Sequence, residues 1–392
     1  MEQKIFCYIG NWGKDSASIG YTVCQFFPQT GQLLPIAEAF SGMSVGAHCV
    51  DRKKNRLYTA DEKPNYPGMR FGGGGEVHCF AIDPESGRLT LVNSRPSYGS
   101  MTSYVALDPK GDFLAVTNHG SRNYVTRIEK TADGGIQRKV LYDSSTVALF
   151  SLEEDGRIGE ICDVYCAEGE GPRPVQFAPH LHSVAFAPDG SFLLVCDKGG
   201  DQIFTFRIDR EKKKLIPAMQ QPFHTKPGSA PRYSAFHPER PFLYTNSELD
   251  PILYGFRYAV DGSLTPIEVR SGYAAECENA EAGMQSALYI SKDGQYLYSL
   301  VRTTDVVSVF RIDQETGTMC PMQQFAPAAK NLRGGRISPG GRFLLLAAMD
   351  SHEVLSCPID SDGFLHEAVS RIPQPTPCCM EFFWPDEQAK GE

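Results

Sequence analysis

The stretch FAIDPESGRLTLV at residues 80–92 decides the fold, because six other stretches of the chain repeat its pattern. In each copy a strand-like run ends at an acidic or turn-forming residue, a short turn follows, and an apolar residue starts a new run. The first apolar residues after the seven turns are spaced 46 to 69 residues apart and are Leu33, Leu89, Ile158, Leu215, Leu264, Met319 and Leu365. Self-similarity at a period of roughly 50 residues is typical of propellers and solenoids.

Each repeat contains four short strand-like runs. In the fourth repeat they are rich in β-branched and aromatic residues and cover 182–188, 192–197, 202–208 and 215–219. Gly, Pro and Asp separate such runs, which is a hairpin signal, and long helical periodicity is absent. Four antiparallel strands in each of seven repeats predict an all-β, seven-bladed β-propeller.

The two ends of the chain predict how the ring closes. Residues 4–10 resemble the second strand of a blade, and residues 378–384 supply the missing first strand. We expect both ends to share one blade, which removes an exposed strand edge. The prediction is a single propeller domain over 1–384 and a tail at 385–392. The third repeat carries an insertion at about 121–142, expected to form a hairpin or a lid.

Composition excludes several functional classes. The net charge of −9 at pH 7 disfavours a nucleic-acid partner, whose phosphates would be repelled. No apolar run approaches the ~18 residues of a membrane helix, and no export signal opens the chain, so we expect a cytoplasmic protein. Twelve cysteines without a C-x-x-C pair predict reduced, mostly buried thiols. No cofactor is predicted; a carboxylate-bound Ca²⁺ or Mg²⁺ and the oligomeric state stay open.

Aligning the repeats predicts one functional mouth. Loops that lead into the first strand and loops that leave the second strand lie at the same end of an antiparallel blade. The first set gives Ser103, His182, Arg232, Ser286 and Arg333, and the second gives Asn118, His119, Asp197, Glu248, Arg302 and Asp350. Three arginines around one opening predict an anionic ligand, because guanidinium binds carboxylate or phosphate through paired hydrogen bonds.

Some of these residues have a structural alternative. Asp197 and Asp201 lie in DKGGD, where short acidic side chains cap turns. His119 is either a turn residue beside the insertion or a substrate contact. The histidines outside this set are interpreted as packing or surface residues.

At these positions the chain resembles the lactonase-type seven-bladed propellers, which include bacterial 6-phosphogluconolactonases and fungal carboxy-cis,cis-muconate cyclases. The resemblance covers nearly the whole chain. It rests on YIG at 8–10, PHLH at 179–182, VCDKGGDQI at 195–203, APRY at 230–233, SEL at 247–249 and VR at 301–302. The family pattern GPRH is APRY here, so Tyr233 replaces a histidine, and the family's NR is VR.

The resemblance implies a set of site residues. Carried over position by position, the proposed catalytic residues are His182, His180, Arg232, Glu248 and Arg302. The proposed substrate-binding residues are Arg333, His119, Asn118, Asp197 and Ser286. The ligand is then a small anionic lactone or carboxylate.

The implied reaction is hydrolysis of a sugar-acid lactone, as in conversion of 6-phosphogluconolactone to 6-phosphogluconate. A histidine, with an ordinary pKa of ~6.5, activates water; an arginine stabilises the developing anion. Two alternatives stay open. The same residues suit cycloisomerisation of a muconate-like dicarboxylate, and a non-catalytic propeller would be an interaction platform with a polar upper face.

Overall fold

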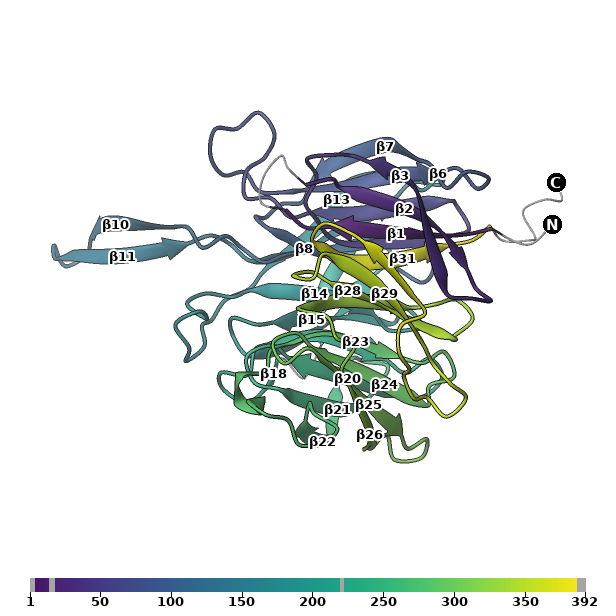
Figure 1. The fold of residues 1–392 in the computed structure, drawn as a ribbon. Coiled ribbons are helices and arrows are strands. Elements are labelled where there is room, and N and C mark those ends of the chain that lie inside the picture. Colours follow the sequence, from purple (N-terminus) through teal and green to yellow (C-terminus); the bar gives the residue numbers. More distant parts are fainter. Residues whose placement is uncertain (1–3, 14–17, 219–221, 386–392) are drawn as a thin grey trace.

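Seven sheets surround a central axis in the computed structural model, which describes residues 4–13, 18–218 and 222–385 (Figure 1). Every strand pair within these sheets is antiparallel. The predicted seven-bladed propeller is confirmed. The one helix in the described residues is the three-residue 3-10 turn Ala280–Ala282, and no helix there is long and apolar enough to cross a membrane. Met219 and residues 386–392, most of the predicted tail, lie outside the described residues.

The blades are numbered here like the sequence repeats, and the strands of each run from the axis outward. Blade 1 contains β31 (Pro377–Phe383), β1 (Ile5–Asn11), β2 (Tyr21–Phe27) and β3 (Gln32–Ala39). Blade 2 contains β4 (Val45–Asp51), β5 (Arg56–Asp61), β6 (Glu76–Ile82) and β7 (Leu89–Pro96). Blade 3 contains β8 (Thr102–Leu107), β9 (Phe113–Asn118), β12 (Thr146–Leu152) and β13 (Ile158–Cys166).

The remaining blades follow the same order. Blade 4 contains β14 (Leu181–Phe186), β15 (Phe192–Asp197), β16 (Gln202–Asp209), β17 (Lys214–Pro217) and the short β18 (Phe223–His224). Blade 5 contains β19 (Pro231–Phe236), β20 (Phe242–Ser247), β21 (Ile252–Tyr258) and β22 (Leu264–Ser271). Blade 6 contains β23 (Gln285–Ile290), β24 (Tyr296–Val301), β25 (Val306–Ile312) and β26 (Met319–Phe325). Blade 7 contains β27 (Leu332–Ile337), β28 (Phe343–Ala348), β29 (Glu353–Pro358) and β30 (Ser370–Pro373).

Blade 1 closes the ring as predicted. Its innermost strand β31 pairs with β1, for example Tyr8 opposite Glu381, so the two ends of the chain share one sheet. The innermost strands of successive blades contact one another all the way round, and β31 contacts both β27 and β4. Every blade therefore packs against a blade on each side, and the ring is closed.

The repeated stretch also joins neighbouring blades. A buried tyrosine on the second strand of one blade donates its hydroxyl hydrogen bond to a glycine carbonyl in the repeated turn of the next blade. The pairs are Tyr8 with Gly87, Tyr58 with Gly156, Tyr244 with Gly317 and Tyr298 with Gly363, at 2.7–3.1 Å. These glycines have φ between 69° and 85°, which glycine adopts without the Cβ clash.

Apolar side chains fill the spaces between blades. The residues that follow the repeated turn are mostly buried, such as Ile158, Leu264, Met319 and Leu365. Each contributes about 1.5–3 kcal/mol relative to leaving the side chain in water. The clusters combine residues of adjacent blades, as where Leu300 of β24 packs with Leu344 and Leu355 of blade 7. The ring is thus held by a core distributed over all blade interfaces.

The insertion forms a hairpin of β10 (Tyr124–Lys130) and β11 (Ile136–Tyr142), a sheet of its own between the second and third strands of blade 3. It projects away from the blades (Figure 1). Several of its apolar side chains are exposed, including Ile136 at 76%. At its base the ring of Tyr142 contacts the ring of Phe177 at 4.9 Å between centroids.

Candidate active site at the propeller mouth

A β-bulge recurs at one end of the innermost strand of every blade. In blade 4, Leu181 pairs with Asp197 but Ser183 pairs with Cys196, so His182 is left unpaired. The same register shift occurs in the other six blades. The seven residues at the shifts are Gly46, Ser103, His182, Arg232, Ser286, Arg333 and Cys378. A bulge re-aims its side chain, and seven equivalent bulges direct these residues toward one end of the ring.

A second set of seven residues follows the second strand of each blade. The backbone N–H of each residue in this set donates to the carbonyl of the residue two positions before the bulge, as Lys198 does to His180 at 3.0 Å. The seven residues are Trp12, Glu62, His119, Lys198, Glu248, Arg302 and Met349. The two sets together form what we call the mouth.

Glu248 lies among three cationic groups in the mouth. Its carboxylate is 2.7 Å from Lys198 Nζ, 2.8 Å from Arg232 Nε and 3.0 Å from an Arg302 terminal nitrogen. Burial alone would raise the pKa of this carboxyl, but the charges of Lys198, Arg302 and Arg232 together hold it well below its ordinary value. Glu248 is therefore ionised throughout the neutral range.

The three cations differ in their access to a ligand. Arg232 is only 2% exposed: it donates to the backbone carbonyl of Ser286, and its guanidinium lies 4.7 Å from the ring centre of Tyr233. The side chains of Lys198 and Arg302 are 15% and 12% exposed. Burial, partly offset by Glu248, lowers the pKa of Lys198 to about 8 and that of Arg302 to about 10.

Arg333 is the fourth cation of the mouth. Its guanidinium lies 5.6 Å from the ring centre of Trp12, whose indole N–H donates to Glu62 at 3.0 Å. Within the described part of the chain, Arg333 has no carboxylate partner at ion-pair distance. Burial opposes its charge, but the field of Glu62 and other groups raises its pKa overall. The Arg333 guanidinium is thus a half-buried charge without a carboxylate partner among the described residues.

Three histidines lie next to the cations. The rings of His119 and His180 stack at 4.3 Å between centroids, and the ring of His182 meets that of His119 edge-on at 6.3 Å. The Nδ1 atom of His182 is buried and has no hydrogen-bond partner among the residues that the structure describes. Burial lowers the pKa of all three histidines, and for His182 the charges of Arg232 and Lys198 lower it further. They are neutral imidazoles at neutral pH.

Comparison with known proteins identifies the family of this chain. The family model for the lactonase seven-bladed β-propellers matches residues 6–382. The chain belongs to this family. A 6-phosphogluconolactonase of Bacillus subtilis is 25% identical over 333 residues, which are 84% of this chain and 87% of that protein. Another, of Formosa agariphila, is 23% identical over 89% of this chain and 90% of its own. The solved structure of a periplasmic gluconolactonase of Pseudomonas aeruginosa shares the fold, with a TM-score of 0.81, 23% identity, and 97% and 99% of the two chains covered.

Three residues predicted to bind substrate make structural hydrogen bonds in this lactonase-family propeller. Asn118 donates to the carbonyl of Ser97 at 2.8 Å. Asp197, whose pKa burial raises to about 6, accepts from the backbone N–H of His180 at 2.7 Å and of Gly199 at 2.9 Å. The Ser286 hydroxyl donates to the carbonyl of Leu332. Each joins backbone segments that shape the mouth.

Asp201 and Asp350 also form hydrogen bonds within the protein. Asp201 accepts from the N–H groups of Gly228 at 2.6 Å and Ala230 at 2.8 Å, so it fixes the segment that leads into Arg232. Asp350 is exposed and accepts from the Asn331 side chain at 3.0 Å. Of the two aspartates in DKGGD, Asp197 therefore caps its own turn through the Gly199 N–H, whereas Asp201 binds the backbone of a distant segment.

The sequence alignment missed Lys198, Glu62 and Trp12. Lys198 follows Asp197 directly, and Glu62 and Trp12 occupy the equivalent positions of blades 2 and 1. The signal was present in the sequence: counting one residue beyond the polar residue that ends each of these second strands, Asn11, Asp61 or Asp197, would have selected all three.

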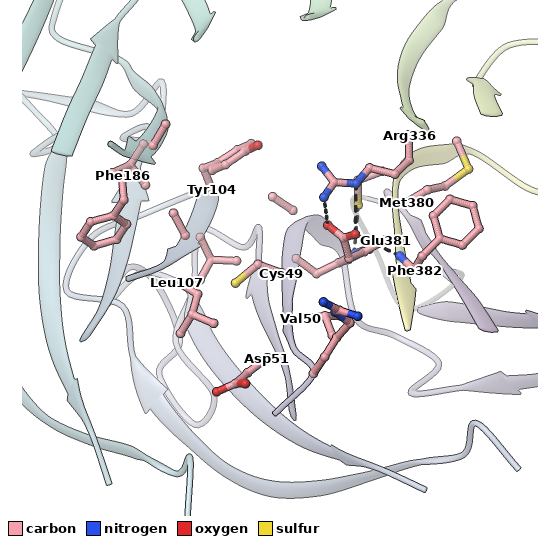
Figure 2. A pocket seen from close by; sticks show the side chains of 18 of the residues that line it. Cys49, Val50, Asp51, Tyr104, Leu107, Phe186, Arg336, Met380, Glu381 and Phe382 are labelled. Atoms are coloured by element: carbon pink, nitrogen blue, oxygen red, sulfur yellow. Dashed lines mark hydrogen bonds and ion pairs between the residues drawn. The ribbon is translucent and has the colours of Figure 1, made fainter. Parts of the chain in front are cut away.

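A separate cavity of about 670 Å³ opens at the other end of the innermost strands (Figure 2). Figure 2 shows Arg336 and Glu381 paired within it, at 2.9 and 3.0 Å. Asp51 at its edge accepts from backbone N–H groups of the adjacent turn. Because Arg336 and Glu381 neutralise one another, this pair offers less to an anion than the cations of the mouth do.

Proposed function

We propose that this protein hydrolyses an anionic sugar-acid lactone at the mouth, with 6-phosphogluconolactone as the substrate. The observation that carries the proposal is the charge of the mouth. Four cations, Lys198, Arg232, Arg302 and Arg333, face two carboxylates, Glu62 and Glu248. Burial raises the pKa of Glu62, which weakens its contribution as an anion. An excess of buried positive charge is stabilised by a negatively charged ligand.

Arg333 is the proposed anchor for the phosphate. It has no carboxylate partner in the described residues, and its guanidinium presents paired donors that match a phosphate or carboxylate. The Trp12 ring covers one face of the Arg333 guanidinium. This contact limits the mobility of Arg333 and leaves the guanidinium N–H groups available. The lactone ring would then lie toward Arg302, Lys198 and the histidines.

His182 is the proposed base. Its imidazole is neutral because burial and two neighbouring cations lower its pKa, so it can accept a proton from water as that water attacks the lactone carbonyl. The resulting oxyanion is stabilised by Arg302. When the ring C–O bond breaks, the ammonium of Lys198, with a pKa of about 8, donates a proton to the leaving alkoxide. The product is the open hydroxy acid, whose carboxyl group ionises; His182 then gives its proton to solvent, and Lys198 takes one back from solvent.

Glu248 and Arg232 are proposed as positioning residues. Glu248 forms ion pairs with Lys198, Arg232 and Arg302 at once. It therefore sets the positions of Lys198 and Arg302, the two groups that would face the lactone. Arg232 is almost fully buried and acts through Glu248. His119 meets the ring of His182 edge-on and holds its orientation, and His180 supports His119 by stacking on it.

A panel of lactones and lactonisable acids tests this proposal. We expect purified protein to release protons from 6-phosphogluconolactone and to leave the ultraviolet absorbance of carboxymuconates unchanged. His182→Gln should lower kcat by ~10²–10⁴-fold, as removal of a general base does. His366→Gln is the matched control, since His366 pairs with Asp360 at an exposed turn. Turnover of the muconate without lactone hydrolysis would show the cycloisomerase alternative to be correct.

A further inference from the structure

Three metal-ligating side chains gather on one face of blade 2, beside the mouth. Asp61 is the last residue of β5, and Glu76 and His78 lie on β6. Asp61 pairs directly with Glu76, and His78 lies two residues farther along β6, so the period of two places all three on the same face. Their ligand atoms all lie within 4.8 Å of one another.

One ring nitrogen of His78 has no hydrogen-bond partner among the described residues. The residue is only 6% exposed, and this nitrogen, Nε2, is buried. Asp61 Oδ2 is 3.6 Å from it, beyond hydrogen-bond distance. The other nitrogen, Nδ1, is 2.7 Å from Ser94 Oγ. A histidine whose one nitrogen is fixed by a hydrogen bond while the other faces two carboxylates has the arrangement of a metal ligand.

The carboxylate of Asp61 already attracts a cation. It is 2% exposed; Oδ1 accepts from the backbone N–H of Ser44 at 2.8 Å, and Oδ2 is 2.9 Å from Lys63 Nζ. The Lys63 side chain is 39% exposed, so its ammonium can move into solvent. The ammonium thus marks a place where a positive charge is stable and from which it can be displaced.

We propose that Asp61, Glu76 and His78 bind a divalent transition-metal ion of the Mn²⁺ or Zn²⁺ type. One imidazole and two carboxylates suit these ions, whereas Ca²⁺ and Mg²⁺ prefer oxygen ligands alone. With bonds of ~2.0–2.2 Å, adjacent ligand atoms of a tetrahedral centre lie roughly 3.3–3.6 Å apart. The 3.6 Å between Asp61 and His78 meets this spacing, and Glu76, half-buried at the first position of β6, has a carboxylate oxygen within 4.8 Å of both ligand atoms.

The ion would fix the base of a loop on the mouth side of the ring. Residues 62–75 join β5 to β6, so the loop begins next to Asp61 and ends next to Glu76. Glu62, the first residue of this loop, accepts the Trp12 indole N–H in the mouth. The site is separate from the groups assigned to lactone hydrolysis, and the proposal does not depend on that function.

Mn²⁺ is the probe of choice, because the twelve free cysteines would compete for Zn²⁺. We would treat the intact protein with a chelator, remove the chelator, and titrate Mn²⁺ while measuring free ion by electron paramagnetic resonance. The wild type should bind one Mn²⁺ per chain, and Zn²⁺ should displace it. Glu76→Gln and, independently, His78→Gln should weaken binding by at least tenfold, whereas His366→Gln should leave it unchanged.

Lys63→Met gives the sharpest test. Because it removes the ammonium that competes for Asp61, it should tighten Mn²⁺ binding severalfold, a result that a purely structural cluster would not give. Wild-type protein that binds no Mn²⁺ at millimolar concentration would overturn the proposal. So would binding that Glu76→Gln and Lys63→Met leave unaltered.

Discussion

Replacing Glu248 with alanine should lower the free energy of unfolding by about 3–5 kcal/mol, the cost of leaving buried charges without their partner. Glu248 is within 3.0 Å of Lys198, Arg232 and Arg302, and the variant would leave these cations facing one another. Arg232, at 2% exposure, cannot turn to water. Chemical denaturation followed by tryptophan fluorescence measures the change.

Glu160→Ala is the matched control for Glu248→Ala. Glu160 also pairs with an arginine, Arg95, at 3.2 Å, but its side chain is 85% exposed, so water replaces the pair and no measurable loss is expected. A Glu248→Ala variant as stable as Glu160→Ala would contradict the view that Glu248 holds the three cations together. Glu248→Gln, which keeps the shape but not the charge, should lie between the two.

Lys198 should impose an alkaline limit on catalysis. Burial lowers its pKa to about 8, so the cationic form predominates below that pH and is lost as the pH rises through it. We therefore expect kcat/KM for an anionic lactone to fall above a pH of about 8, while the lowered pKa of His182 keeps that base unprotonated down to mildly acidic pH. Initial rates, corrected for spontaneous lactone opening at each pH, measure the profile.

Two substitutions separate the charge of Lys198 from its other contacts. Lys198→Met should reduce kcat/KM at neutral pH by ~10²-fold or more, the usual effect of removing an acid or an anion-stabilising group, and should abolish the alkaline limit. Lys198→Arg should move the limit to higher pH, because a guanidinium stays charged. An unchanged alkaline limit in Lys198→Met would assign it to another group.

The fold was predictable because the conformation of each copy of the repeated stretch is determined by residues within that copy. In six copies a turn glycine adopts positive φ, in the fourth Lys213 does so, and the apolar residue that follows is mostly buried between blades. Ring closure could be predicted in the same way. The first strand of blade 1 does not precede β1 in the sequence, and β31 follows the last complete blade, so the two strands complete one sheet. Both features are properties of short segments, so they are visible without tertiary information.

The residues of the mouth were predictable only in part, because which side chains reach it depends on the exact strand register of each blade. Successive side chains of a strand point to opposite faces, so an alignment that is wrong by one residue selects the wrong neighbour. Asn118 and Asp197 are the last residues of their strands and face the protein, whereas His119 and Lys198 follow them and belong to the mouth. The bulges at His182, Arg232 and Arg333 restored the correct face on the innermost strands, which is why those three residues were found.

The contacts between the charged side chains of the mouth could not be predicted from the sequence. Nothing in a single repeat indicates that Glu248 meets three cations from blades 4, 5 and 6, or that Arg333 meets Trp12 across the closing blade. These contacts join segments far apart in the chain. They change the proposed role of Arg232 from catalytic residue to support for Glu248.

The most direct test of an anion-selective lactonase compares kcat/KM for 6-phosphogluconolactone and for unphosphorylated gluconolactone in the same proton-release assay. We predict a preference of at least ~10²-fold for the phosphorylated lactone, which Arg333→Met should largely remove by lowering only the rate with that substrate. Equal rates with both lactones, or no hydrolysis of either, would contradict the account.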